Sequence, residues 1–235
     1  MTFRTTVVTA GIKGLVRFIC KVDDEALRKV PREGPLIVVV NHINFLEIPV
    51  LYTHLHPRPM TAYAKVETWD NPLLAFLSNS WGAIPLRRGE ADVEAIQKGL
   101  RALRDGSILF IAPEGTRSHT GHLLRGKPGT ALLALRSGAP LLPIACYGGE
   151  KFQDNIKRLR RTDFYIVVGE PFYVQADGRK ARREARQKIA DEVMYQISAL
   201  LPQDYRGCYA DLSEATEHYL RFPDAACSNL LRARN

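Results

Sequence analysis

The sequence Leu36-Ile37-Val38-Val39-Val40-Asn41-His42 is an apolar, largely β-branched run that ends abruptly on two polar residues. Such a run without alternation predicts a strand buried on both faces, as in parallel sheets covered by helices. A second apolar run, residues 107–112, is followed by Pro113-Glu114-Gly115-Thr116-Arg117. Because open α/β sheets bind ligands at the carboxyl ends of their strands, polar residues directly after two strands predict a functional site there.

The rest of the chain alternates between helical and strand patterns. The spacing of apolar residues and the positions of Gly and Pro predict helices over 5–21, 46–55, 92–103, 128–138 and 178–200, and another that starts at Asn71-Pro72. The same signals predict strands over 36–40, 61–64, 84–86, 107–112, 141–146 and 164–168. This alternation predicts an α/β fold with a mainly parallel or mixed sheet flanked by helices. We expect three segments: an N-terminal amphipathic helix (1–22), one main domain (23–200) and a C-terminal helical extension (201–235), in which Asp211 and Glu214 suit the start of a short helix.

Composition and charge narrow the possible partners. The chain has 235 residues, of which 46% are hydrophobic and 25% charged, and this mix is globular rather than disordered or fibrous. Its net charge of +8 predicts an anionic partner: nucleic acid, a membrane surface, or a phosphorylated or CoA-type substrate. The basic stretch 157–161 has no interleaved aromatic side chains to stack on bases, which argues against nucleic acid.

The cysteines and the apolar runs set the expected compartment. The four cysteines are far apart and form no C-x-x-C pair, so we expect reduced thiols in a cytosolic protein and no metal site. The longest run without a charged residue, 71–86, is shorter than the roughly 18 apolar residues that a spanning helix needs. Lys13 and Arg17 interrupt the only apolar stretch that could serve as a signal peptide, so none is expected.

The first helix has two possible environments. Its apolar residues, Val8, Ile12, Leu15, Val16 and Ile19, form one stripe, whereas Lys13, Arg17 and Lys21 form another. A helix lying in the plane of a membrane has this pattern, and so does a helix packed on its own domain. The pattern alone leaves both open.

His42 and Glu47 are spaced for a catalytic pair. In Asn41-His42-Ile43-Asn44-Phe45-Leu46-Glu47 the carboxylate follows the imidazole by five positions across a strand-to-helix turn. Such a carboxylate can bind one ring nitrogen and leave the other as the acceptor that a general base requires. The alternative is a histidine at a helix start with a solvated glutamate.

Three further clusters offer groups for phosphate. Ala112-Pro113-Glu114-Gly115-Thr116-Arg117-Ser118 combines a glycine, which lets a ligand approach the backbone, with a guanidinium suited to bidentate phosphate binding. Gly82 to Arg88 and Arg125-Gly126-Lys127 offer additional cations. Each cluster by itself is also compatible with solvated charge on the surface.

Together these blocks resemble the 1-acylglycerol-3-phosphate acyltransferase (lysophosphatidate acyltransferase) family of the glycerolipid acyltransferase superfamily. In the family's order, residues 41–47 resemble N-H-x4-D, 82–88 resemble G-x-I-x-I-x-R, 112–118 resemble F-P-E-G-T-R-S, and 139–144 resemble the proline-containing V-P-I-x-P-V block. The resemblance spans about residues 31–175 and implies a glycerol-3-phosphate acyltransferase-like fold. Two positions depart from it: Glu47 replaces Asp, and Ala112 replaces the usual Phe.

The resemblance implies a reaction and a set of site residues. His42 would be the general base and Glu47 its orienting partner, and Arg88, Glu114, Gly115, Thr116, Arg117 and Lys127 would bind the acceptor. The acyl donor would be acyl-CoA or acyl carrier protein and the acceptor a lysophospholipid such as 1-acylglycerol-3-phosphate, at the cytoplasmic face of an anionic membrane, with no metal or other cofactor. Alternatives are the same chemistry on another lysophospholipid or a glycolipid, and a non-catalytic lipid-binding relative. Glu47 is the critical departure, because its extra methylene must be absorbed by the backbone or the rotamer.

Overall fold

The computed structural model describes residues 3–89, 92–176 and 183–233, and its centre is a seven-stranded sheet. The strands lie in the order β1 (Cys20–Asp23), β7 (Thr162–Val168), β6 (Leu141–Tyr147), β2 (Leu36–Val40), β5 (Ile108–Ile111), β3 (Met60–Lys65) and β4 (Ile84–Leu86). Neighbouring strands are parallel except for the antiparallel β6–β7 pair. Together with the helices on both faces, this confirms the predicted α/β fold.

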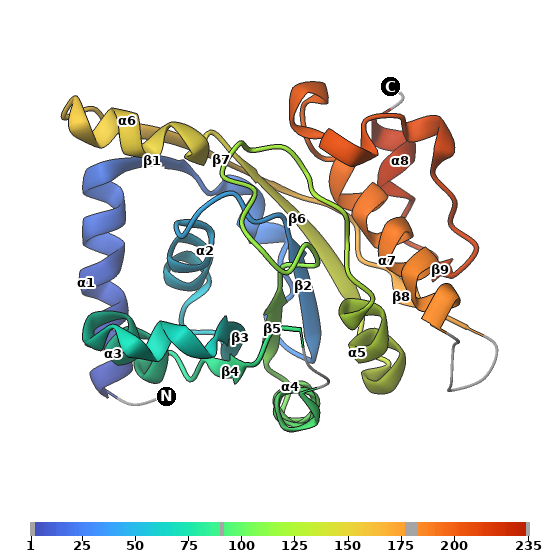
Figure 1. The fold of residues 1–235 in the computed structure, drawn as a ribbon, viewed down its shortest axis with the longest axis horizontal. Coiled ribbons are helices and arrows are strands. Elements are labelled where there is room, and N and C mark those ends of the chain that lie inside the picture. Colours follow the sequence, from blue (N-terminus) through green and yellow to red (C-terminus); the bar gives the residue numbers. More distant parts are fainter. Residues whose placement is uncertain (1–2, 90–91, 177–182, 234–235) are drawn as a thin grey trace.

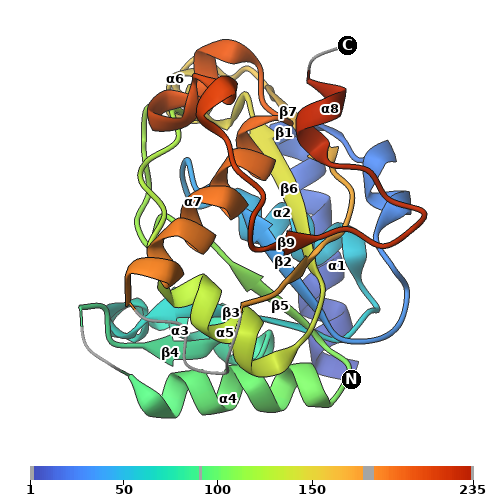
Figure 2. The same ribbon diagram turned by 90° about the vertical axis from the view of Figure 1, so that its right-hand side faces the viewer.

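Helices cover both faces of the sheet (Figures 1 and 2). One core, between the sheet and α1 (Phe3–Ile19) and α2 (Glu47–Leu55), includes Val38 of β2; α3 (Pro72–Ser80) packs beside α1. The other core, under α4 (Val93–Arg104), α5 (Gly129–Ser137) and α7 (Arg183–Ser198), includes Ile37 and Val39. The continuous apolar run of β2 follows from this arrangement, because its side chains alternate between two dry cores.

The N-terminal helix packs on its own domain. Val16 is buried and Ile12 and Ile19 are partly buried in the core that α1 shares with α2, while Leu15 from the same predicted stripe is exposed. The helix ends at Ile19 because the chain continues as β1, which pairs with β7; the prediction of helix to residue 21 is therefore two residues too long. No helix among the described residues is long and apolar enough to cross a membrane.

The later part of the chain departs most from expectation. The described part of the predicted 178–200 helix is α7, and the predicted residues 178–182 lie outside the described ranges. The α6 helix (Phe152–Lys157) is not predicted at all. The described residues from 201 to 233 contribute three 3-10 turns, the strand β9 (Leu220–Arg221), which pairs with β8 (Tyr173–Val174), and the short helix α8 (Asn229–Arg232). Asp211 does cap the expected position, but the element that follows is a single 3-10 turn.

Strand order places the two polar segments side by side. β2 and β5 are adjacent and parallel, with Val39 opposite Ile111, so that their carboxyl ends meet at the same edge. His42 follows the first strand and Glu114 the second. The residues from 112 to 128, here called the 112–128 loop, contain no helix or strand and pass over this edge beside α7 (Figure 2).

Candidate active site

His42 and Glu47 form a hydrogen-bonded pair at the end of β2. The His42 Nδ1 atom lies 3.0 Å from Glu47 Oε2, and the Glu47 side chain is completely buried in the first turn of α2. A carboxylate is favoured there because the amino terminus of a helix carries partial positive charge. With Nδ1 occupied by the carboxylate, Nε2 is the ring nitrogen left to exchange a proton with a ligand.

Hydrogen bonds hold both ends of the turn that carries His42 and Glu47. The Asn41 side chain is buried and makes two hydrogen bonds of 2.8 Å to the backbone of Cys146, so that it prolongs the β2–β6 pairing by one residue. Asn44 donates its backbone N–H to Glu47 Oε1 (3.1 Å) and its side-chain amide to the Gly149 carbonyl (2.6 Å). These bonds fix the backbone on either side of His42 before any ligand arrives.

Glu114 links the 112–128 loop to the same turn. One of its carboxylate oxygens accepts the backbone N–H of His42 (2.8 Å) and the other accepts that of Leu124 (2.9 Å). The side chain is buried, and burial raises the pKa of Glu114 to about 7 despite these two bonds. Both oxygens therefore face backbone in this structure, and direct contact of Glu114 with an acceptor stays a prediction.

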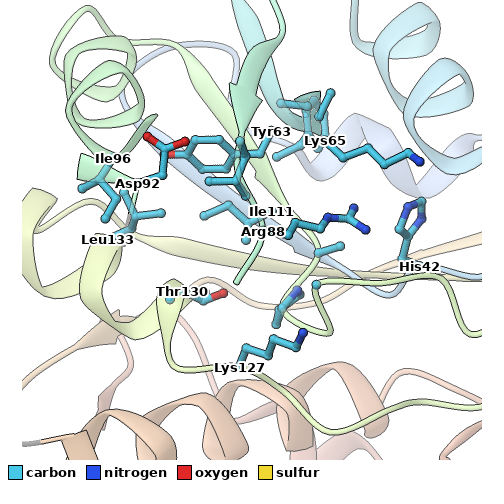
Figure 3. A pocket seen from close by; sticks show the side chains of 18 of the residues that line it. His42, Tyr63, Lys65, Arg88, Asp92, Ile96, Ile111, Lys127, Thr130 and Leu133 are labelled. Atoms are coloured by element: carbon cyan, nitrogen blue, oxygen red, sulfur yellow. The ribbon is translucent and has the colours of Figure 1, made fainter. Parts of the chain in front are cut away.

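His42 opens onto a cavity of about 320 Å³. In Figure 3 the half of the cavity away from His42 is lined by Ile96, Ile111 and Leu133, with Asp92 and Thr130 beside them. The Lys65 and Arg88 side chains extend toward His42, and Lys127 enters from the 112–128 loop. The cavity therefore combines a basic end at the imidazole with a mainly apolar end farther away.

Three of the predicted acceptor residues line this cavity: Arg88, Gly115 and Lys127. Gly115 has a φ of 67°, and a Cβ at this position would lie 3.0 Å from Lys127 Cδ, so glycine suits both the backbone and the lysine above it. Thr116 and Arg117 are exposed and lie outside the lining. Arg117 is nevertheless held beside the His42 segment, because the next residue, Ser118, donates its N–H to the His42 carbonyl (2.8 Å).

Residues of α7 and of the C-terminal segment hold the 112–128 loop in place by hydrogen bonds. The Gly126 N–H donates to the Tyr209 hydroxyl (3.0 Å), which itself donates to Asp191 of α7 (2.7 Å). The Gly126 carbonyl accepts from Gln187 (2.9 Å). Leu123 is buried and exchanges backbone hydrogen bonds with residues 205 and 208. Gly126, the residue before Lys127, is thus held by hydrogen bonds to side chains far away in the sequence.

Sequence reasoning missed two parts of the site. Lys65 ends a parallel strand, and the rule that identified His42 and Glu114 also applies to it. Tyr209, Gln187 and Asp191 carry no motif, and only the packing of α7 against the loop reveals them. Within the described ranges, no group of three or more His, Cys, Asp or Glu side chains could hold a metal ion, and all four cysteines are free thiols.

Comparison with known proteins agrees with this architecture. The family model described as Acyltransferase matches residues 21–147, more than half of the chain. The chain is 29% identical over 182 residues to a chloroplastic 1-acyl-sn-glycerol-3-phosphate acyltransferase of Brassica napus, with 74% of this chain and 51% of that protein covered. It is 35% identical over 119 residues to a lyso-ornithine lipid O-acyltransferase of Pseudomonas aeruginosa, with 50% and 44% covered.

The chain thus spans about half the length of these curated relatives. A solved structure supports the fold: the 1-acyl-sn-glycerophosphate acyltransferase PlsC from Thermotoga maritima matches with a TM-score of 0.59 and 23% identity, over 80% of this chain and 77% of that one. The family match includes β2 with His42, the α2 start with Glu47 and the 112–128 loop. The chain belongs to the acyltransferase family.

Proposed function

We propose that this protein transfers a fatty acyl group from acyl-CoA or acyl carrier protein to the free hydroxyl of 1-acylglycerol-3-phosphate, which makes phosphatidate. The observation that carries the proposal is the buried Glu47 at 3.0 Å from His42 Nδ1, on an imidazole that lines a basic and apolar cavity. The names of the relatives support the same class of reaction.

In the proposed reaction His42 acts as a general base. Its Nε2 takes the proton of the acceptor hydroxyl as the oxygen attacks the thioester carbonyl. The tetrahedral intermediate collapses, the carbon–sulfur bond breaks, and the thiolate leaves with the proton that His42 had accepted. No acyl-enzyme is formed. Glu47 keeps the imidazole in one tautomer and stabilises its charged form, the role of a buried carboxylate in other histidine-based sites.

Cations at the His42 end of the cavity suit a phosphorylated acceptor. Arg88 and Lys127 line it, and Lys65 extends into the same region (Figure 3). In our proposal Arg88 and Lys127 bind the acceptor phosphate, and Gly115 allows close approach to the loop backbone. Thr116 and Arg117 contribute at the rim, beside the His42 segment. Glu114 acts through the backbone that it holds.

The apolar end of the cavity suits an acyl chain. Ile96, Ile111 and Leu133 line it, and hydrocarbon that leaves water for such a surface gains about 25 cal/mol per Å². A phosphate at the basic end and an acyl chain at the apolar end describe an amphiphile, which is the chemistry of a lysophospholipid or of a fatty acyl thioester.

A membrane surface is the proposed place of the reaction. Phe3, Val7, Leu15 and Phe18 are exposed and follow one another at helical spacing along α1. With the α1 cations Arg4, Lys13 and Arg17 they form, in our proposal, the amphipathic surface of a helix that lies on the cytoplasmic face of an anionic bilayer.

A second acceptor is favoured by one comparison. The lyso-ornithine lipid O-acyltransferase from Pseudomonas aeruginosa is 35% identical to this chain over 119 residues, and its named acceptor is an amino-acid lipid. In a panel of lysophosphatidate, lyso-ornithine lipid and a glycolipid, each with acyl-CoA and acyl carrier protein donors, we expect the fastest thiol release with lysophosphatidate. Equal or faster release with lyso-ornithine lipid would replace the proposed acceptor, and no release with any pair would refute the acyltransferase proposal.

A further inference from the structure

The turn between α6 and β7 carries an apolar side chain held out in solvent. Leu159 is 95% exposed and has a φ of 52°, a backbone conformation that leucine rarely adopts. Hydrogen bonds maintain this turn: the Leu159 N–H donates to the Ile156 carbonyl (3.1 Å), and the Arg160 N–H donates to that of Asn155 (2.8 Å). These bonds hold the backbone in the conformation that leaves the Leu159 side chain exposed.

Cations surround this side chain. We call residues 156–160, Ile156-Lys157-Arg158-Leu159-Arg160, the basic tip; all five are exposed. None of its three cations has a carboxylate within ion-pair distance in the described part of the chain. Exposed apolar side chains next to unpaired cations are typical of segments that bind anionic lipid surfaces.

The basic tip is joined to the end of α1. The Arg161 guanidinium, next to the tip, donates to the carbonyls of both Arg17 and Cys20, at 2.7 Å each. Figure 1 shows α6 lying across this end of α1. Phe18, one residue from Arg17, is 78% exposed. Two large exposed apolar side chains from distant parts of the sequence, Phe18 and Leu159, thus each lie within two residues of a partner in these hydrogen bonds.

The other end of α6 contacts the catalytic turn. Gly149, just before α6, accepts the hydrogen bond from the Asn44 side chain, and the rings of Phe45 and Phe152 pack edge to face with centroids 5.4 Å apart. Asn44 and Phe45 are the second and third residues after His42. The short helix α6 therefore connects the basic tip with the turn that carries His42.

We propose that the basic tip and Phe18 dock on an anionic lipid bilayer, with Leu159 and Phe18 entering the interface and Lys157, Arg158 and Arg160 binding lipid phosphates. This deepens the proposed function, on which it rests for the membrane surface, by adding a second lipid contact to the apolar face of α1. A bilayer is favoured over an acidic protein because it accepts protruding apolar side chains between cations without a shaped pocket. Binding to an acidic carrier protein is the competing outcome.

The test is cosedimentation of the full chain with phosphatidylcholine vesicles, with and without phosphatidylserine, and with no acyl donor or acceptor present. Leu159→Asn removes the apolar side chain, and asparagine tolerates the positive φ, so the fold is retained. Arg158→Gln with Arg160→Gln removes two cations. Matched controls are Leu231→Asn on α8 and Arg101→Gln with Arg104→Gln on α4, all at exposed positions.

We expect the double arginine variant to bind phosphatidylserine vesicles roughly 30-fold more weakly, since each cation near an anionic surface contributes about fivefold. Leu159→Asn is expected to weaken binding severalfold, and both controls to bind like the wild type. Wild-type affinity in both tip variants, or no binding by the wild type, would overturn the inference. So would tip variants that lose affinity for acyl carrier protein but not for vesicles.

The same variants separate this inference from the proposed reaction. Turnover of dispersed short-chain substrates is expected to be unchanged in Leu159→Asn, because the tip does not line the cavity. A protein that acylates no acceptor but needs the tip for vesicle binding would refute the proposed reaction and support the docking surface.

Discussion

Glu47 Oε2 lies 3.0 Å from His42 Nδ1, while Oε1 of the same carboxylate accepts the Asn44 N–H at 3.1 Å. The longer side chain, which replaces the aspartate expected from the family pattern, thus reaches the imidazole and also closes the turn. This geometry supports a working pair rather than a site that has lost its function.

Shortening this carboxylate is expected to slow catalysis. In Glu47→Asp the carboxylate cannot reach both His42 and Asn44 from the same backbone, and misplacement by about 1 Å can cost 10²-fold in rate. We expect kcat to fall about 10- to 100-fold. Glu47→Gln keeps the length but loses the charge that stabilises the imidazolium, so a larger loss is expected. Steady-state kinetics of thiol release measure both, and unchanged kcat in both variants would contradict the role of Glu47.

The raised pKa of Glu114 predicts that the free energy of unfolding depends on pH. Burial is the main cause that raises its pKa from the ordinary 4.5 to about 7 in the folded protein. Between these values the folded state holds a proton that the unfolded state has released, so the free energy of unfolding falls as pH rises and then levels off. The full effect is roughly 3 kcal/mol. Urea unfolding at about pH 5 and about pH 8 measures it.

Glu114→Gln is the matched variant for that measurement. It cannot ionise, so its stability should lack this decline between the two pH values. At the lower pH it should be less stable than the wild type, because an amide oxygen can accept only one of the two N–H groups, those of His42 and Leu124. A variant with the same pH dependence as the wild type would show that another group titrates.

Removing the cavity cations is expected to weaken binding of the phosphorylated acceptor but not of the acyl donor. Arg88→Gln or Lys127→Gln should raise KM for a phosphorylated acceptor about 10- to 100-fold, since a hydrogen bond to a charged group contributes roughly 1.5–3 kcal/mol. KM for the acyl donor should change little. Arg101→Gln, at an exposed position on α4, is the control. Equal effects on 1-acylglycerol, which has no phosphate, would contradict this assignment.

Tyr209 is expected to act on the same acceptor from behind the loop. Tyr209→Phe removes the hydroxyl that binds the Gly126 N–H, next to Lys127. We expect this variant to have a higher KM for the lysophospholipid substrate with little change in kcat. Tyr195→Phe is the control, because its ring packs edge to face on Tyr209 at 5.0 Å but no described hydrogen bond uses its hydroxyl. If both variants have the same KM, Tyr209 contributes only packing.

The sequence predicted the sheet core and the edge where the site lies, because these follow from local patterns. The apolar run 36–40 and its polar end require no knowledge of distant residues, and the parallel arrangement brings His42 and Glu114 to one edge. The family pattern then indicated Arg88, and the cluster Arg125-Gly126-Lys127 indicated Lys127; both line the cavity.

The parts that the sequence could not predict depend on long-range packing. Nothing near Tyr209 indicates that its hydroxyl bonds Gly126 of the 112–128 loop, 83 residues away in the sequence. The apolar stripe of α1 was equally compatible with a membrane and with packing on its own domain, and only the packing shows that Val16 belongs to the core. The buried position of Glu114 is likewise set by two backbone groups from separate segments.

The most direct test of the central claim, that His42 is the general base for acylation of a hydroxyl, is thiol release by His42→Ala with acyl thioester and lysophosphatidate. Thermal unfolding checks that the variant is folded. We predict a loss of kcat of about 10²- to 10⁴-fold, the range supplied by a positioned acid–base group, with acceptor binding nearly unchanged. Thiol release that depends on lysophosphatidate and continues at the wild-type rate would contradict the account.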